Sequence, residues 1–93
     1  MIRSFASRET ELIWQGLRSK RLPSDIQRIA LRKLLYLSRA KAIVDLREPP
    51  GNSLEALKRD RLGQWSIRIN DKWRICFRWV NDNAEDVEIV DYH

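Results

Sequence analysis

Residues 64–79 alternate between apolar and polar side chains in two consecutive segments, which predicts a β-hairpin with one buried face. The apolar members of this alternation are Trp65, Ile67, Ile69, Trp73, Ile75, Phe77 and Trp79. A three-residue loop, Asn70-Asp71-Lys72, brings all of them to the same face, whereas a two-residue loop would mix the two faces. We therefore predict an antiparallel hairpin in which Ile69 pairs with Trp73 and the tryptophans belong to the core.

Two amphipathic helices are expected before the hairpin. Ser7 is placed to cap the first helix, which is expected to end near Gly16. Ser24 and Gln27 fit a capping box, and apolar residues recur at helical spacing after them. This pattern predicts a second helix over residues 24–39.

Short apolar segments at the two ends of the chain complete the predicted sheet. Residues 2–5 are expected to form a short first strand, and residues 87–90 the last one. The order predicts an α+β fold in which two helices pack on an antiparallel sheet. Ninety-three residues suit a single domain that spans residues 1–93.

The composition limits the partners and the location. A formal net charge of +5 favours nucleic acid as the partner, ahead of an acidic protein or a membrane surface, although a generic basic protein also fits. Cys76 is the single cysteine, so an intrachain disulfide and a zinc cluster are excluded. We expect Cys76 to be a half-buried strand residue rather than a nucleophile. No segment resembles a signal peptide or a membrane span, which makes a cytoplasmic protein the default.

The polar face of the hairpin carries arginines. The predicted register places Arg68 opposite Arg74, and Gln64 opposite Arg78. Like charges directly opposite one another destabilise a sheet, so this face is either solvated or built to meet an anion. Three further cations lie just before the hairpin: Lys58, Arg59 and Arg61.

The chain closes on Asp91-Tyr92-His93, which contains its single histidine. Cleavage of RNA needs a base for the 2′-hydroxyl, cations for the phosphoryl oxygens and an acid for the leaving oxygen, and it does not require a metal. His93, Asp91 or Glu55 could carry protons, and Tyr92 could bind the phosphate or stack on a base. A simpler alternative is that Asp91 only anchors the last strand beside the arginines.

Several linked motifs carry a resemblance to a known family. They read PPGNSLEALK at residues 49–58, GQWSIRIN at 63–70, WRICF at 73–77 and VEIVDYH at 87–93. Together with IRSF at residues 2–5, they resemble the HigB toxins (plasmid maintenance killer type) of the RelE-like toxin–antitoxin superfamily. The resemblance implies a compact α+β fold with helices on one face of the sheet and a concave basic face opposite.

The resemblance also implies an activity and partners. It implies an endonuclease that enters the ribosomal A site, contacts ribosomal RNA and cuts mRNA during translation. It implies a HigA-type helix-turn-helix antitoxin, through which the complex contacts operator DNA. No cofactor and no membrane partner are implied.

The resemblance assigns roles residue by residue. Arg74 matches the family's phosphate-stabilising arginine, Lys58 matches the basic residue of the central loop, and residues 91–93 match the terminal catalytic run. Some relatives carry a catalytic histidine where this chain has Glu55. The remaining residues expected to hold RNA are Arg59, Arg61, Arg68 and Arg78.

Two other classes of function remain open from the residues. The first is a basic module that binds RNA or the ribosome and blocks translation without cleavage. The second is a DNA-binding regulator, which is disfavoured because the link between the helices is long and basic and the hairpins would be surplus.

Overall fold

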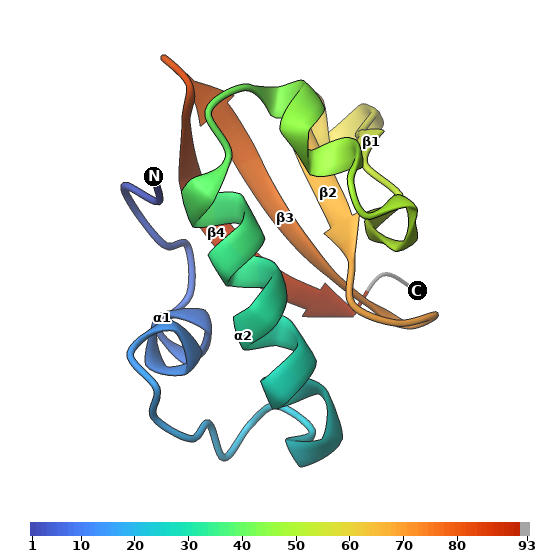
Figure 1. Cartoon of the computed structure of the whole chain (residues 1–93). Helices are drawn as coiled ribbons and strands as arrows, with labels where there is room; N and C mark the ends of the chain where they lie inside the picture. Colours follow the sequence, from blue (N-terminus) through green and yellow to red (C-terminus); the bar gives the residue numbers. More distant parts are fainter. Residues whose placement is uncertain (92–93) are drawn as a thin grey trace.

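The computed structural model describes residues 1–91, in which two α-helices pack against a four-stranded antiparallel sheet (Figure 1). The helices are α1 (Arg8–Trp14) and α2 (Ser24–Arg39). The strands are β1 (Glu55–Ala56), β2 (Gln64–Arg68), β3 (Trp73–Val80) and β4 (Asn83–Asp91), in the order β1-β2-β3-β4. Three short 3₁₀ turns lie between α2 and β2: η1 (Ile43–Arg47), η2 (Pro50–Asn52) and η3 (Arg59–Arg61). The predicted α+β class and the limits of the second helix are confirmed.

The hairpin of β2 and β3 has the predicted register. Trp65 pairs with Phe77, Ile67 pairs with Ile75, and the Ile69 amide donates to the Trp73 carbonyl at 2.9 Å. The Asn70 side-chain oxygen accepts hydrogen bonds from the Lys72 and Trp73 amides at 2.9 and 2.8 Å, which closes the three-residue loop. The alternation of side chains therefore determined both the pairing and the face that each residue occupies.

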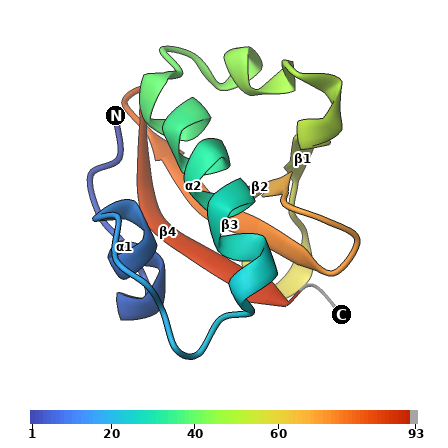
Figure 2. The same ribbon diagram turned by 60° about the horizontal axis from the view of Figure 1, so that its bottom comes forward.

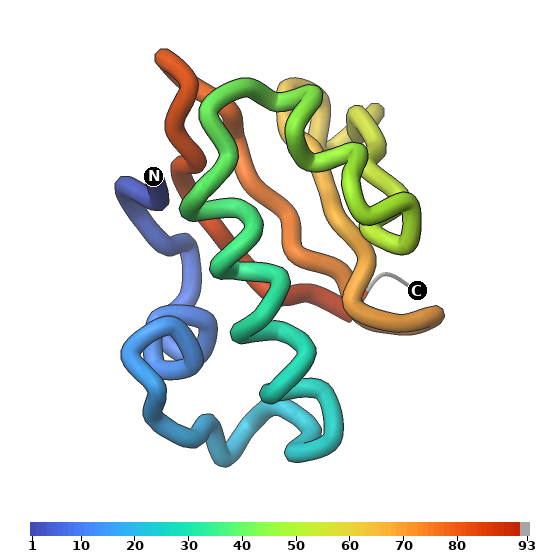
Figure 3. Tube along the Cα trace, viewed as in Figure 1, coloured from blue at the N-terminus to red at the C-terminus, as the bar shows by residue number. Residues whose placement is uncertain are grey.

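The N-terminal segment runs parallel to β4 (Figure 3). The short first strand expected over residues 2–5 takes the form of two isolated bridges, Ile2 to Ala84 and Phe5 to Val87. The Arg3 amide donates to the Ala84 carbonyl at 2.8 Å, so the chain start is fixed along β4.

The core lies between α2 and the sheet, and Figure 2 shows the helix lying across the strands. Its fully buried members include Ala30, Leu34 and Leu37 of α2, and Ile67, Ile75, Phe77 and Val87 of the sheet. Trp14, Trp65, Trp73 and Trp79 are partly buried against this cluster. The tryptophans of the hairpin are therefore core residues, as predicted. None of the helices in residues 1–91 is long and apolar enough to cross a membrane.

The two helix starts differ in how well the sequence predicted them. Ser7 caps α1 as expected, since its Oγ accepts the Thr10 amide at 3.1 Å. The prediction of a capping box at the start of α2 is wrong, because Pro23 is the N-cap residue and Ser24 lies inside the helix. The Gln27 side chain instead binds the preceding loop and donates to the carbonyls of Ser19 and Leu22 at 2.8 and 2.9 Å. The Gln27 side chain is therefore bound to the loop and does not form the capping box.

This difference gives a matched pair of substitutions. Ser7→Ala is expected to lower the free energy of unfolding by about 1 kcal/mol, because the Thr10 amide loses its cap. Ser24→Ala removes the same atoms where no side-chain cap exists, and should change stability by less than about 0.5 kcal/mol. Urea unfolding followed by tryptophan fluorescence measures both. Equal losses for the two variants would contradict the assignment of the caps.

Candidate functional site

The second face of the sheet, opposite α2, carries the predicted arginine cluster. Arg68 lies directly opposite Arg74, and Gln64 lies opposite Arg78, as predicted. Between them Ser66 faces Cys76, and both of these residues are fully buried. The centre of this face is therefore closed to solvent and only its rim is charged, so it is not a simple solvated surface.

Carboxylates from other segments accompany the arginines. Arg74 lies 3.7 Å from Glu55, Arg61 lies 3.4 Å from Glu88, and Arg78 lies 3.5 Å from Asp86. Arg68 forms an ion pair with Asp71. These acids offset the repulsion between stacked arginines. Sequence reasoning did not identify the acids at positions 71, 86 and 88, although the alternation within β4 could have placed Glu88 on this face.

Arg74 is the most enclosed arginine of this face. Its side chain is 14 % exposed, compared with 40 % for Arg68 and 45 % for Arg78. Its Nη2 donates to the Ser53 carbonyl at 2.6 Å, and its Nη1 faces the Glu55 carboxylate. A cation fixed in this way needs little reorganisation to meet a developing negative charge.

The residue that holds Arg74 has an unusual backbone. Ser53 adopts a left-handed conformation with φ 46° and ψ 54°, which costs a non-glycine residue on the order of 1–2 kcal/mol. Such strain persists only where the surroundings enforce it. The carbonyl that accepts Arg74 is therefore presented by a backbone that is held in place.

A cavity of about 270 Å³ lies between the central loop (residues 49–63) and the end of β4. Its lining residues are Leu57, Lys58, Arg59, Asp60, Arg61, Val90 and Asp91. Val90 is the direct β-partner of Arg74, so this cavity adjoins the arginine. Lys58 and Arg59 are exposed, and neither forms an ion pair with any residue within 1–91. The structure thus brings the loop cations, Arg74 and the end of the last strand together.

The predicted proton-handling residues differ in their placement. Asp91 lines the cavity, but it pairs with Trp73 in the sheet and its carboxylate lies 3.5 Å from the Lys72 ammonium. This ion pair gives weight to the alternative in which Asp91 anchors the last strand. Glu55 lies beside Arg74. Tyr92 and His93 lie outside the described residues.

Cys76 differs from expectation in its burial. It is fully buried rather than half-buried, because it lies at the closed centre of the second face. Burial raises the pKa of its thiol, Glu88 raises it further, and the charges of Arg61 and Arg74 act in the opposite direction. A buried thiol with a raised pKa is a poor nucleophile, which agrees with the structural role expected for Cys76.

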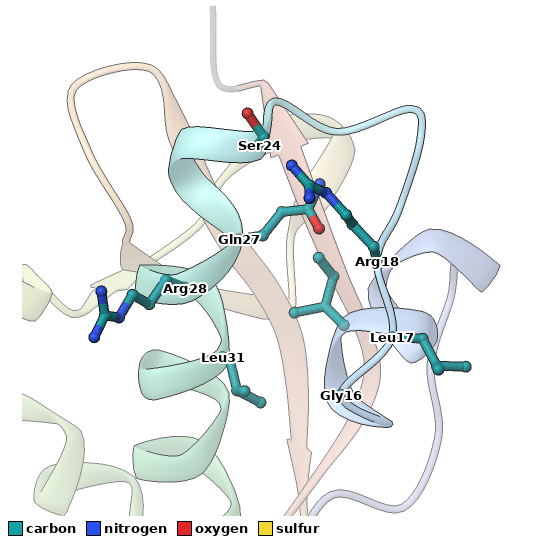
Figure 4. A pocket seen from close by; sticks show the side chains of 8 residues that line it. Gly16, Leu17, Arg18, Ser24, Gln27, Arg28 and Leu31 are labelled. Atoms are coloured by element: carbon teal, nitrogen blue, oxygen red, sulfur yellow. The ribbon is translucent and has the colours of Figure 1, made fainter.

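A larger cavity of about 440 Å³ lies between the end of α1 and the first half of α2 (Figure 4). Its lining includes Ile13, Leu17, Gln27 and Leu31. No predicted site residue lies in it. The larger cavity is also lined by the cations Arg18 and Arg28. The smaller cavity is the better candidate for chemistry, because Asp91 and the β-partner of Arg74 line it together with the loop cations.

Two known proteins are similar to this chain in sequence. Toxin HigB-1 of Vibrio cholerae serotype O1 (strain ATCC 39315 / El Tor Inaba N16961) is 44 % identical over 67 residues, which cover 72 % of this chain and 70 % of that protein. A protein of Proteus vulgaris named Endoribonuclease HigB is 35 % identical over 94 residues, which cover 100 % of both chains. Both relatives are thus similar to this chain over most of their length.

A solved structure and a family model extend these similarities. The YoeB-YefM complex from Staphylococcus aureus contains a chain that matches with a TM-score of 0.62 and 16 % identity, covering 100 % of this chain and 98 % of that one. At this identity the match shows the fold alone. The family model described as "RelE-like toxin of type II toxin-antitoxin system HigB" matches residues 4–93. This chain therefore belongs to the HigB-like, RelE-like family of type II toxin–antitoxin toxins.

Proposed function

We propose that this toxin is a ribosome-dependent endoribonuclease that cuts mRNA in the ribosomal A site and thereby stops translation and growth. The observation that carries the proposal is Arg74, an enclosed arginine held by Ser53 whose β-partner, Val90, lines a basic cavity. The 35 % identity to a protein named Endoribonuclease HigB supports the reaction class. The alternative is a basic module that blocks the ribosome without cutting.

The reaction is an intramolecular transesterification in the RNA. A base takes the proton of the 2′-hydroxyl, the 2′-oxygen bonds to the adjacent phosphorus, and the bond to the 5′-oxygen breaks. An acid protonates the departing 5′-oxygen, which leaves a 2′,3′-cyclic phosphate and a 5′-hydroxyl. Arg74 stabilises the extra negative charge on the phosphoryl oxygens in the transition state.

The proton carriers are assigned to the end of the chain and to the central loop. His93 or Asp91 handles the 2′-hydroxyl proton, and an imidazole suits this step because it changes protonation near neutral pH. Glu55 is a further candidate because its carboxylate lies 3.7 Å from Arg74. Tyr92 orients the nucleotide by a hydrogen bond or by stacking on the base.

The remaining cations hold RNA. Lys58 and Arg59 are exposed next to the cavity, so they contact the message or ribosomal RNA first. Arg61, Arg68 and Arg78 are each paired with a carboxylate, so RNA phosphates must compete with these acids. This competition weakens non-specific binding of RNA to these three arginines.

The partners follow from the family. The chain is a toxin of a type II toxin–antitoxin system, and we assign it a HigA-type helix-turn-helix antitoxin. The antitoxin brings the complex to operator DNA. The site of action is the cytoplasm, where ribosomes translate mRNA.

Mapping of mRNA 5′ ends after induction tests this function. Primer extension on a translated message is expected to show new 5′ ends within the coding region. The same message carrying a mutated start codon should remain intact, because cleavage needs the translating ribosome. Growth arrest without new ends would overturn the nuclease and favour the non-cutting module.

A further inference from the structure

Helix α2 contains a buried lysine, Lys33, that has no role in the proposed reaction. Lys33 is 6 % exposed, and its Nζ donates to the Asn52 Oδ1 at 2.5 Å. The ammonium also lies 5.9 Å from the centre of the Tyr36 ring. Burial, and then the charges of Arg32 and Arg68, lower the pKa of Lys33. A lysine that is buried at this cost needs a structural or functional reason.

Its partner, Asn52, is fully buried and fixed at both ends of its amide. The Asn52 Nδ2 donates to the carbonyls of Leu46 and Glu48 at 3.2 and 3.1 Å, while its Oδ1 accepts from Lys33. Lys33 has donors and no acceptor, so it selects the orientation in which the amide oxygen faces α2. The reverse orientation would place the Asn52 amide nitrogen against the Lys33 ammonium. It would also place the amide oxygen against the carbonyls of Leu46 and Glu48.

The residue after Asn52 is the one that holds Arg74. Ser53 is left-handed, and its carbonyl accepts the Arg74 Nη2 at 2.6 Å. Glu55, two residues further along, faces the Arg74 Nη1. Asn52 therefore links Lys33 of α2 to the segment that carries the Ser53 carbonyl and Glu55. These are the two groups that contact the Arg74 guanidinium.

We propose that Lys33 and Asn52 are positioning residues for cleavage: they fix the turn that presents the Ser53 carbonyl and Glu55 to Arg74. The inference rests on the nuclease function proposed above. This Lys33–Asn52 pair, the clamp, acts from the α2 side of the molecule, so neither of its residues needs to touch RNA. Releasing Asn52 lets the strained turn relax, and the guanidinium then loses its fixed direction towards the phosphate.

Lys33→Met tests the clamp, since it keeps the length and apolar stem of the side chain and removes the donor. Steady-state rates of mRNA cleavage on stalled ribosomes are measured at saturating and subsaturating concentrations of ribosome complex. The expected result is a fall in kcat of about 10- to 100-fold with KM changed by less than about threefold. Arg32→Met, which removes the neighbouring exposed cation of α2, should leave both constants close to wild type.

A double-mutant cycle separates positioning from general damage. Because the clamp acts through Arg74, adding Lys33→Met to Arg74→Lys should slow cleavage by less than about threefold beyond Arg74→Lys alone. Fully multiplicative losses, or wild-type kcat for Lys33→Met, would overturn the inference. Lys33→Arg keeps a donor and should recover a large part of the rate.

The folding of the variants and the proposed nuclease function are checked in the same series of experiments. Asn52→Asp keeps the acceptor for Lys33 and removes both amide donors, so it provides a second test if Lys33→Met fails to fold. It should likewise lower kcat rather than raise KM, and an unchanged kcat would overturn the clamp. If the wild-type protein cuts and the clamp variants cut equally fast, only this inference fails. If the wild-type protein does not cut ribosome-bound mRNA, the proposed function fails and the clamp fails with it.

Discussion

Arg74→Ala is expected to slow mRNA cleavage on the ribosome by about 10²- to 10³-fold, the loss that follows removal of one preorganised donor to a developing oxyanion. The guanidinium is enclosed and held by the Ser53 carbonyl, and Val90, the β-partner of Arg74, lines the basic cavity. Its loss removes charge stabilisation from the transition state more than from the ground state. The effect should therefore appear in kcat, with a smaller change in KM.

Arg39→Ala is the matched control for Arg74→Ala. Arg39 is exposed in the last turn of α2, outside the second face of the sheet, so its loss removes the same charge from elsewhere in the chain. Cells that express Arg39→Ala should arrest like wild type, and cells that express Arg74→Ala should grow. Equal arrest by the two variants, with equal cleavage rates, would remove Arg74 from the mechanism.

His93→Ala is expected to lower the cleavage rate by about 10²- to 10⁴-fold, which is the usual contribution of a general acid or base. The single histidine of the chain is the only side chain here whose ordinary titration lies near neutral pH. The plot of kcat/KM against pH should therefore lose its inflection near neutrality in the variant. Thermal unfolding checks that the variant is folded.

Asp91→Asn separates the two candidate proton carriers. If Asp91 serves mainly as the partner of Lys72, the substitution should lower stability by less than about 1 kcal/mol and leave the pH profile unchanged. A pH profile that keeps its neutral inflection in His93→Ala and loses its acidic limb in Asp91→Asn would assign the first proton to Asp91. Growth arrest at wild-type strength by His93→Ala would exclude His93 from the reaction.

The central hairpin of the sheet could be predicted because its signal is periodic, whereas β1 was not predicted and β4 begins at Asn83, before the predicted residues 87–90. Alternation over residues 64–79 determines which side chains share a face, and a three-residue loop is then the one that aligns the faces. The opposition of Arg68 and Arg74 follows directly from that register. The extent of α2 was predictable for the same reason, since apolar residues recur at helical spacing along it.

The contacts that hold Arg74 could not be predicted, because they join segments that are distant in sequence. Ser53 reaches Arg74 from the central loop, and Lys33 reaches Asn52 from α2. No local pattern indicates either bond. The predicted capping box at Ser24 was wrong for a related reason, because the Gln27 side chain binds the preceding loop rather than its own helix end.

The chemical nature of the ends of the cut mRNA tests the central claim most directly. Purified toxin is added to ribosomes that translate a labelled message, and the new ends are probed with polynucleotide kinase and with a 5′-phosphate-dependent exonuclease. Attack by the 2′-hydroxyl predicts 5′-hydroxyl ends and 2′,3′-cyclic phosphates, formed only when the ribosome is present and lost with Arg74→Ala. Fragments with 5′-phosphates and 3′-hydroxyls, or equal cleavage of free RNA, would contradict the account.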